Sequence, residues 1–96
     1  MKDIREEDRV GLARDLAEAK WSRANDAWES ITWTIIHDEA CGIPLNDTGS
    51  IRGYVWDGAK SIDMPSIDVI YEVQSDLIII HYAEFRDAPY GQAGRA

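Results

Sequence analysis

The spacing of hydrophobic residues changes near residue 50, and this change limits the chain to a fold that is helical first and β-rich afterwards. In residues 4–24 the apolar side chains recur every three or four positions, which predicts an amphipathic helix whose apolar face holds Val10, Ala13, Leu16, Ala17, Trp21 and Ala24. After residue 50 they alternate at a spacing of two, which is typical of strands. We therefore predict an α+β fold, with an N-terminal helical hairpin packed on a small antiparallel sheet.

A second helix is predicted from a cap at residues 25–26 to about residue 39 or 40, where a glycine and a proline follow. Its apolar side chains are Trp28, Ile31, Ile35 and Ile36. Residues 31–36 also alternate at a spacing of two and are rich in β-branched side chains, so a strand is an open alternative there. We favour the helix because the helical spacing continues from Trp28.

Three strands are predicted in the second half of the chain, over residues 51–56, 67–74 and 77–86. The short connection at residues 75–76 makes the last two an antiparallel hairpin. We expect Val69, Tyr71 and Ile79 to be buried. With 96 residues the chain forms a single domain over residues 1–96, and its tail is expected to be flexible from about residue 88.

The charge of the chain argues against a nucleic-acid-binding platform. The formal net charge is −8, from 18 acidic and 10 basic residues, and both halves of the chain are acidic. Affinity for RNA or DNA depends mainly on Lys and Arg that neutralise phosphates. We therefore expect weak nucleic-acid binding and a basic protein partner.

The sequence lacks targeting and metal-binding signals, which predicts a cytoplasmic protein without a cofactor. The N-terminal residues lack the apolar stretch of a signal peptide, and no run is long enough to cross a membrane. The single cysteine, Cys41, excludes an internal disulfide and a cysteine-cluster metal site. His37 and His81 have no second ligand at a metal-binding spacing, so we expect no metal ion.

Several short segments from residue 42 onward occur in the same order as in a known protein family. They are Gly42-Ile43-Pro44-Leu45, Ile51-Arg52-Gly53-Tyr54, Val69-Ile70-Tyr71-Glu72-Val73 and Phe85-Arg86-Asp87-Ala88, followed by Tyr90. In this order, and over roughly residues 27–90, the chain resembles the RelE/ParE superfamily of toxin–antitoxin toxins. The resemblance implies a small sheet packed on a helical hairpin and a partner of the antitoxin type. Some members cleave mRNA on the ribosome, and others poison DNA gyrase.

The resemblance also implies a catalytic set, for which Arg52, Arg86 and Tyr90 are the candidates. Arginine would stabilise charge on the phosphate, and tyrosine would relay a proton. Asp68 stands where RNA-cleaving members carry an arginine just before the Val-Ile-Tyr-Glu-like strand, and a carboxylate repels the phosphate it would have to hold. Two further departures from the family are the loop at residues 57–66, which is longer, and residues 1–9, which look too charged for the family's first strand.

Strand alternation divides the sheet into two faces. We expect one face to be exposed and to bring Arg52 opposite Asp68 as a surface ion pair, together with Tyr54, Trp56, Ile70, Glu72, Tyr82, Glu84 and Arg86. The other face is the expected core side, with Ile51, Val55, Ile67, Val69, Tyr71, Ile79 and Phe85. One or two exposed tryptophans would suit an interface anchor.

These patterns favour an interaction protein on a RelE/ParE-like scaffold, which binds an antitoxin-like partner and whose nuclease function is degenerate. The open alternatives are an active ribosome-dependent mRNA-cleaving toxin that uses Arg52, Arg86 and Tyr90, and a gyrase-inhibiting toxin of the ParE type. The ribosome or gyrase would then be a further target, and a homodimer is also open. Enzymatic activity is undecided, with the sequence leaning against it.

Overall fold

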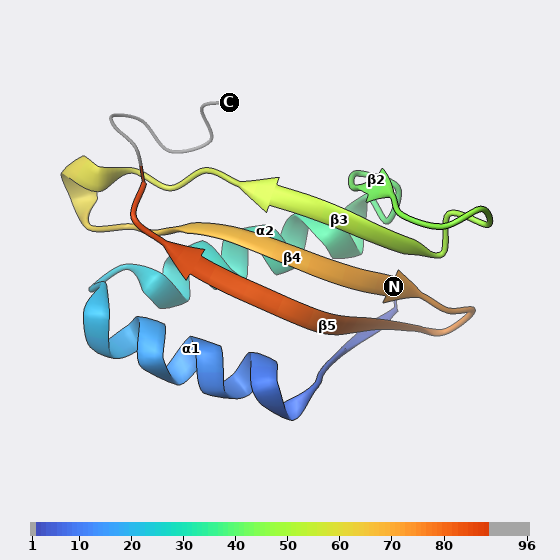
Figure 1. Ribbon diagram of the computed structural model, residues 1–96, viewed down its shortest axis with the longest axis horizontal. Helices are drawn as coiled ribbons and strands as arrows, with labels where there is room; N and C mark the ends of the chain where they lie inside the picture. Colours follow the sequence, from blue (N-terminus) through green and yellow to red (C-terminus); the bar gives the residue numbers. More distant parts are fainter. Residues whose placement is uncertain (1, 89–96) are drawn as a thin grey trace.

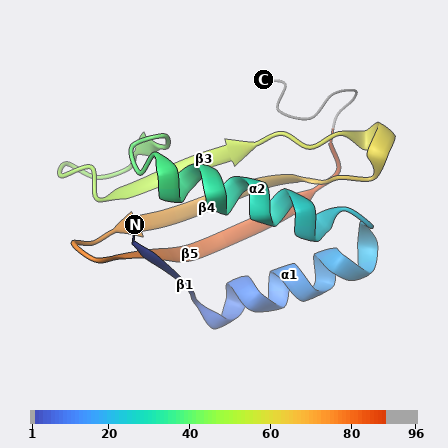
Figure 2. The same cartoon turned by 180° about the vertical axis from the view of Figure 1, so that it is seen from behind.

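Two helices pack against one face of a five-stranded sheet, and the described residues leave the other face open (Figure 1, Figure 2). The computed structural model describes residues 2–88. In chain order the elements are β1 (Asp3–Glu6), α1 (Asp8–Lys20), α2 (Ala24–His37), β2 (Ile43–Pro44), β3 (Ile51–Trp56), the short 3-10 helix η1 (Lys60–Ile62), β4 (Ser66–Val73) and β5 (Leu77–Arg86).

The strand order is β1-β5-β4-β3-β2, in which β1 is parallel to β5 and the other neighbouring pairs are antiparallel. The predicted α+β class is therefore confirmed, as are the three antiparallel strands of the C-terminal half. The sheet as a whole is mixed, because β1 joins it in the parallel direction. Neither helix within residues 2–88 is long and apolar enough to cross a membrane.

Asp3–Glu6 form strand β1, so the predicted helical conformation of residues 4–6 is wrong. Alternate side chains of β1 are exposed, which leaves Asp3 and Arg5 in water. Ile4 packs on the core, and Glu6 accepts a hydrogen bond from Arg14 Nη1 at 2.9 Å. A strand needs an apolar side chain only at every second position, and β5 supplies the backbone partner. The view that this segment is too charged for a strand is therefore also wrong.

Helix α2 includes residues 31–36, so the helical alternative favoured for them is confirmed. Ile31 and Ile35, four positions apart, are both fully buried against the sheet. Trp33 lies on the opposite side of the helix, with 62% of its surface exposed, and stacks on His37 at 4.0 Å between ring centroids. The helix begins at Ala24, before the predicted cap, and ends before the predicted residue 39 or 40.

A bulge in β5 changes which of its side chains face the core. The pairing of β4 with β5 skips one residue, His81, so the strand alternation changes phase at that point. Ile78 and Ile80 are consequently fully buried, while Ile79 turns to the open face and is half-buried. The predicted burial of Ile79 is therefore wrong.

The two faces of β3 are the reverse of those predicted. Pairing with β4 places the side chains of Arg52, Tyr54 and Trp56 on the helix side, beside Tyr71, Val69 and Ile67. Val55 lies on the open face, with 52% of its surface exposed. Both faces of this strand carry apolar side chains, so alternation alone does not decide between them. The two larger aromatic side chains pack on the core.

The core lies between α2 and the central strands, and the predicted burial of Val69 and Tyr71 is confirmed. The hydroxyl of Tyr71 donates a hydrogen bond to the carbonyl of Glu39 at 2.7 Å and accepts one from the backbone N–H of Gly42 at 3.0 Å. Burial raises the pKa of Tyr71 well above its ordinary value. This phenol therefore stays protonated and anchors the segment after α2 to β4.

The long loop between β3 and β4 folds back on its own chain. The backbone N–H of Gly58 donates to the buried hydroxyl of Ser66 at 3.0 Å, and Ala59 forms an isolated bridge with Met64. A Cβ atom on Gly58 would lie 2.2 Å from the carbonyl oxygens of Met64 and Pro65. This close approach requires glycine.

Candidate functional site

Arg52 holds two loops together. Its Nε donates to the carbonyl of Gly49 at 2.9 Å, and its Nη1 donates to the carbonyl of Gly42 at 2.8 Å and more weakly to that of Ala40 at 3.4 Å. These acceptors belong to the segments before β2 and before β3. The predicted ion pair with Asp68 is wrong, because Arg52 points to the helix side of the sheet. Its guanidinium is occupied by backbone carbonyls.

Arg86 is the residue that pairs with Asp68. Its Nη1 donates to Asp68 Oδ1 at 2.5 Å on the open face, where both side chains are more than one third exposed. A pair this exposed contributes only about 0–1 kcal/mol to stability. The pair also affects the predicted chemistry, because the carboxylate of Asp68 partly neutralises the charge with which Arg86 was expected to stabilise a phosphate.

The structure does not bring Arg52 and Arg86 together. Arg52 lies on the helix side of the sheet and Arg86 on the open face. Tyr90 lies outside the described residues, as does the part of the predicted flexible tail that follows residue 88. The two candidates that lie within residues 2–88, Arg52 and Arg86, therefore form no common site.

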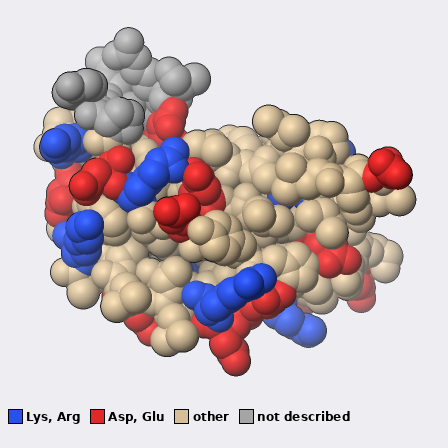
Figure 3. Space-filling view, viewed as in Figure 1, with Lys and Arg blue, Asp and Glu red and all other residues tan. Residues whose placement is uncertain are grey.

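The open face carries acidic and basic side chains next to each other. In Figure 3 the blue and red groups are interleaved, and uncharged surface lies between them. The hydroxyl of Tyr82 donates to Glu84 Oε1 at 3.2 Å, and this carboxylate raises the pKa of Tyr82. Within residues 2–88 the face shows no continuous basic area that would follow a phosphate backbone.

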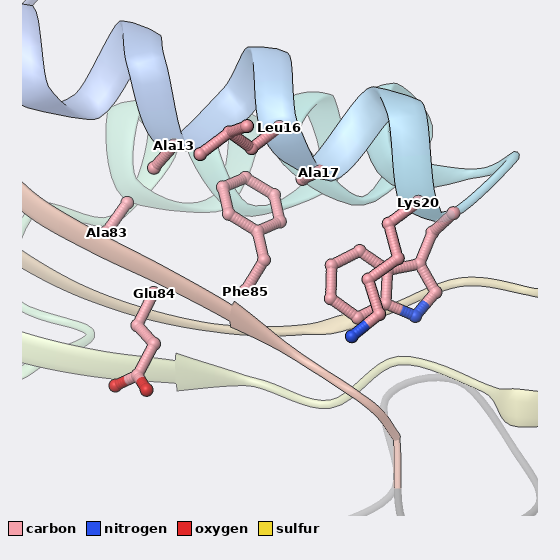
Figure 4. Close-up of a pocket in the computed structure, with 8 residues that line it drawn as sticks. Ala13, Leu16, Ala17, Lys20, Ala83, Glu84 and Phe85 are labelled. Atoms are coloured by element: carbon pink, nitrogen blue, oxygen red, sulfur yellow. The ribbon is translucent and has the colours of Figure 1, made fainter.

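A groove of about 320 Å³ runs between α1 and the end of β5. Figure 4 shows Phe85 reaching from β5 toward Leu16, with Ala13 and Ala17 beside it. Its charged lining residues are Lys20 and Glu84, and the rest of the lining is Trp21 and Ala83. The groove is therefore mainly apolar. Lys20 is the charged side chain on the α1 side, while the side chain of Glu84 points away from α1 (Figure 4).

Two leucines on α1 extend the apolar surface beyond the groove. Leu16 is 74% exposed and Leu12 is 65% exposed, four residues apart on the same side of the helix. Leu16 was predicted to lie on the buried face. The buried contacts of α1 are instead made by Val10 and Ala17. Side chains this large and this exposed, next to an apolar groove, mark a surface that a partner can cover.

The outer edge of β5 beside this groove is only partly covered. Strand β1 pairs with Leu77 to Ile80, and Arg9 Nε donates to the carbonyl of His81 at 2.6 Å. From Tyr82 to Arg86 no strand within residues 2–88 lies against this edge (Figure 1). An uncovered edge presents backbone donors and acceptors to an added strand.

His81 lies between two carboxylates on the open face, a position that was not predicted from the sequence. Its Nδ1 contacts Glu7 Oε2, and its Nε2 lies 2.8 Å from Glu72 Oε1. The hydrogen bond with Glu7, followed in size by the one with Glu72, raises the pKa of His81. The hydrogen bond between His81 and Glu72 in turn lowers the pKa of Glu72. No sequence signal links positions 7 and 81, because the bulge in β5 decides where His81 points.

Within the described part of the chain, no group of three or more His, Cys, Asp or Glu side chains could hold a metal ion. Cys41 lies beside the hydroxyl of Tyr71, at 3.7 Å from Sγ to oxygen, and burial raises its pKa. A thiol with a raised pKa is a poor nucleophile at neutral pH.

The chain matches no protein-family model, no curated protein and no solved structure.

Proposed function

We propose that this chain is a protein-binding domain on a RelE/ParE-like scaffold, that its partner is of the antitoxin type, and that its docking surface is the groove between α1 and β5. The observation that carries the proposal is the apolar groove beside an uncovered strand edge. Leu12 and Leu16 enlarge its apolar area. Such a combination suits an extended peptide segment of a partner protein.

An added strand would bind in two ways. Its backbone would form hydrogen bonds with the edge of β5 from Tyr82 onward, and every second side chain would point into the groove. Phe85 and Leu16 would surround an apolar anchor in the groove. Glu84, on the open face, would accept a hydrogen bond from a basic side chain on the opposite side of the added strand. The net charge of −8 would attract a basic partner over a longer range.

The occupied arginines argue against the mRNA-cleaving alternative. Arg52 is held by backbone carbonyls and Arg86 pairs with Asp68, so each guanidinium would have to leave its present acceptors to stabilise charge on a phosphate. A catalytic arginine must be preorganised toward the substrate, and loss of one such donor costs about 10²–10³ in rate.

Selection from a displayed peptide library against the full chain tests the binding proposal. We expect enriched peptides to combine apolar and basic residues, and their affinity to fall at least about tenfold for Leu16→Glu, which puts a charge into the groove. Leu45→Glu is the matched control, since Leu45 is 54% exposed near β2 and does not line the groove. Equal losses in both variants, or no enrichment at all, would contradict the proposal.

Expression in a bacterial host tests the two toxin alternatives. We expect little effect on growth and no ribosome-linked mRNA cleavage. Growth arrest with cleavage that Arg86→Ala or Tyr90→Phe abolishes would establish the nuclease instead. Arrest without cleavage, accompanied by DNA damage, would establish the gyrase-directed alternative.

A further inference from the structure

The imidazole of His81 joins three elements that are far apart in the sequence. Its Nδ1 contacts Glu7, which stands between β1 and α1, and its Nε2 contacts Glu72 of β4 at 2.8 Å. His81 itself is the extra residue at the bulge of β5. Its side chain is only 27% exposed, so both contacts are partly shielded from water.

Glu7 is the residue at which β1 passes into α1. It occupies the N-cap position of α1, but its side chain forms no capping hydrogen bond and turns to His81 instead. Its backbone N–H donates to the carbonyl of Ile80 at 3.1 Å, and its own carbonyl accepts from Val10 at 2.9 Å. A contact that fixes the side chain of Glu7, such as the one with His81, therefore also fixes the start of α1 against β5.

An imidazole can donate from both nitrogens only when it is protonated. A neutral imidazole has one N–H, so its second nitrogen would present a lone pair to a carboxylate. We propose that Glu7, His81 and Glu72 form a proton-dependent clamp, which fastens the junction of β1 and α1 to the sheet when His81 is charged and releases it when His81 loses its proton. The clamp works whether or not a partner binds in the groove.

The shifted pKa values give the direction of the switch. The pKa of His81 is raised above its ordinary value of 6.5, so its contribution is complete below 6.5 and is lost as pH rises through the raised value. The pKa of Glu72 is lowered below 4.5, so its contribution is present above 4.5 and is lost only as pH falls through the lowered value. The clamp is therefore closed at mildly acidic pH and opens toward alkaline pH.

Neighbouring groups keep the carboxylates occupied when the clamp opens. Arg9 of α1 lies 3.3 Å from Glu7 Oε1, and Gln74 Nε2 donates to Glu72 Oε2 at 3.4 Å. Arg5 of β1 pairs with Ile79, so the side chain of Arg5 lies on the open face of the sheet, as does that of His81. Deprotonation of His81 consequently loosens the β1–α1 junction and leaves the central strands intact.

Amide hydrogen exchange on the full chain tests the clamp. Protection factors are measured at about pH 5.5 and about pH 8.5, on either side of the raised pKa of His81. As the pH rises from about 5.5 to about 8.5, we expect the protection factors of β1 and of the first turn of α1 to fall about threefold to tenfold relative to those of β4. His37→Gln is the matched control and should keep this pH dependence, because His37 stacks on Trp33 away from the clamp. His81→Gln should remove it, since glutamine does not titrate.

NMR titration of His81 gives a second measurement that does not require the variant to fold. We expect His81 of the unmodified chain to titrate above its ordinary value of 6.5, and Glu7→Gln and Glu72→Gln each to lower the pKa of His81. The proposal is overturned if His81 titrates at or below 6.5. It is also overturned if the protection of β1 is independent of pH, or if His81→Gln keeps the full pH dependence.

Discussion

Replacing Tyr71 by Phe removes one hydroxyl and leaves the ring in place. Tyr71 is fully buried, and its hydroxyl holds the segment after α2 by donating to Glu39 and accepting from Gly42. The phenyl ring fills almost the same volume, so the change isolates the two hydrogen bonds.

The loss of stability follows from the two backbone groups that no longer have the hydroxyl as a hydrogen-bond partner. The N–H of Gly42 is buried and loses its acceptor, which costs about 1–3 kcal/mol. The carbonyl of Glu39 is partly exposed and can turn to water, so its lost bond costs about 0.5–1.5 kcal/mol. We expect the free energy of unfolding to fall by about 2–4 kcal/mol, and Tm by roughly 10–20 °C for a domain of this size.

Urea unfolding followed by circular dichroism measures this difference. Tyr82→Phe is the matched control, because the hydroxyl of Tyr82 reaches an exposed carboxylate and its loss should cost no more than about 0.5 kcal/mol. If the two variants are destabilised equally, Tyr71 does not anchor the segment after α2, and the reasoning is refuted.

Other predictions use the same unfolding assay or a binding titration. Gly11→Ala should stabilise the chain by about 0.5–1 kcal/mol, since nothing lies within 4 Å of the added methyl group in α1, and a loss of stability would contradict this. Gly58→Ala should destabilise it by about 1–3 kcal/mol or more, because the methyl group would overlap two backbone carbonyls, and a neutral effect would mean that the loop moves freely. RNA binding at physiological salt should be weak or absent, and micromolar binding with a steep salt dependence would show that basic groups are free.

The helices and the C-terminal strands were predictable because their signals are local. Ile31 and Ile35 lie four residues apart, and the helical spacing outweighs their β-branched side chains once α2 packs on the sheet. The strand boundaries at residues 51–56 and 77–86 follow directly from alternation and from the short connection between the last two strands.

The features that were missed depend on contacts between distant segments. β1 exists because β5 offers it a backbone partner, and a charged segment gives no local sign of this. The faces of β3 are set by its register with β4. Arg52 binds carbonyl groups, which every residue carries, so no sequence pattern distinguishes it from a phosphate-binding arginine. The position of His81 depends on a bulge that alternation does not reveal.

The place of β5 in the sheet also governs when the fold can form during synthesis. β5 follows the other strands in the chain, yet it lies between β1 and β4, and Asp3 pairs with Leu77. At about 5–20 residues per second, a ribosome makes β1 several seconds before its partner. Until then α1 lacks the strand it packs on, and the apolar side chains of the first half stay exposed to chaperones and proteases.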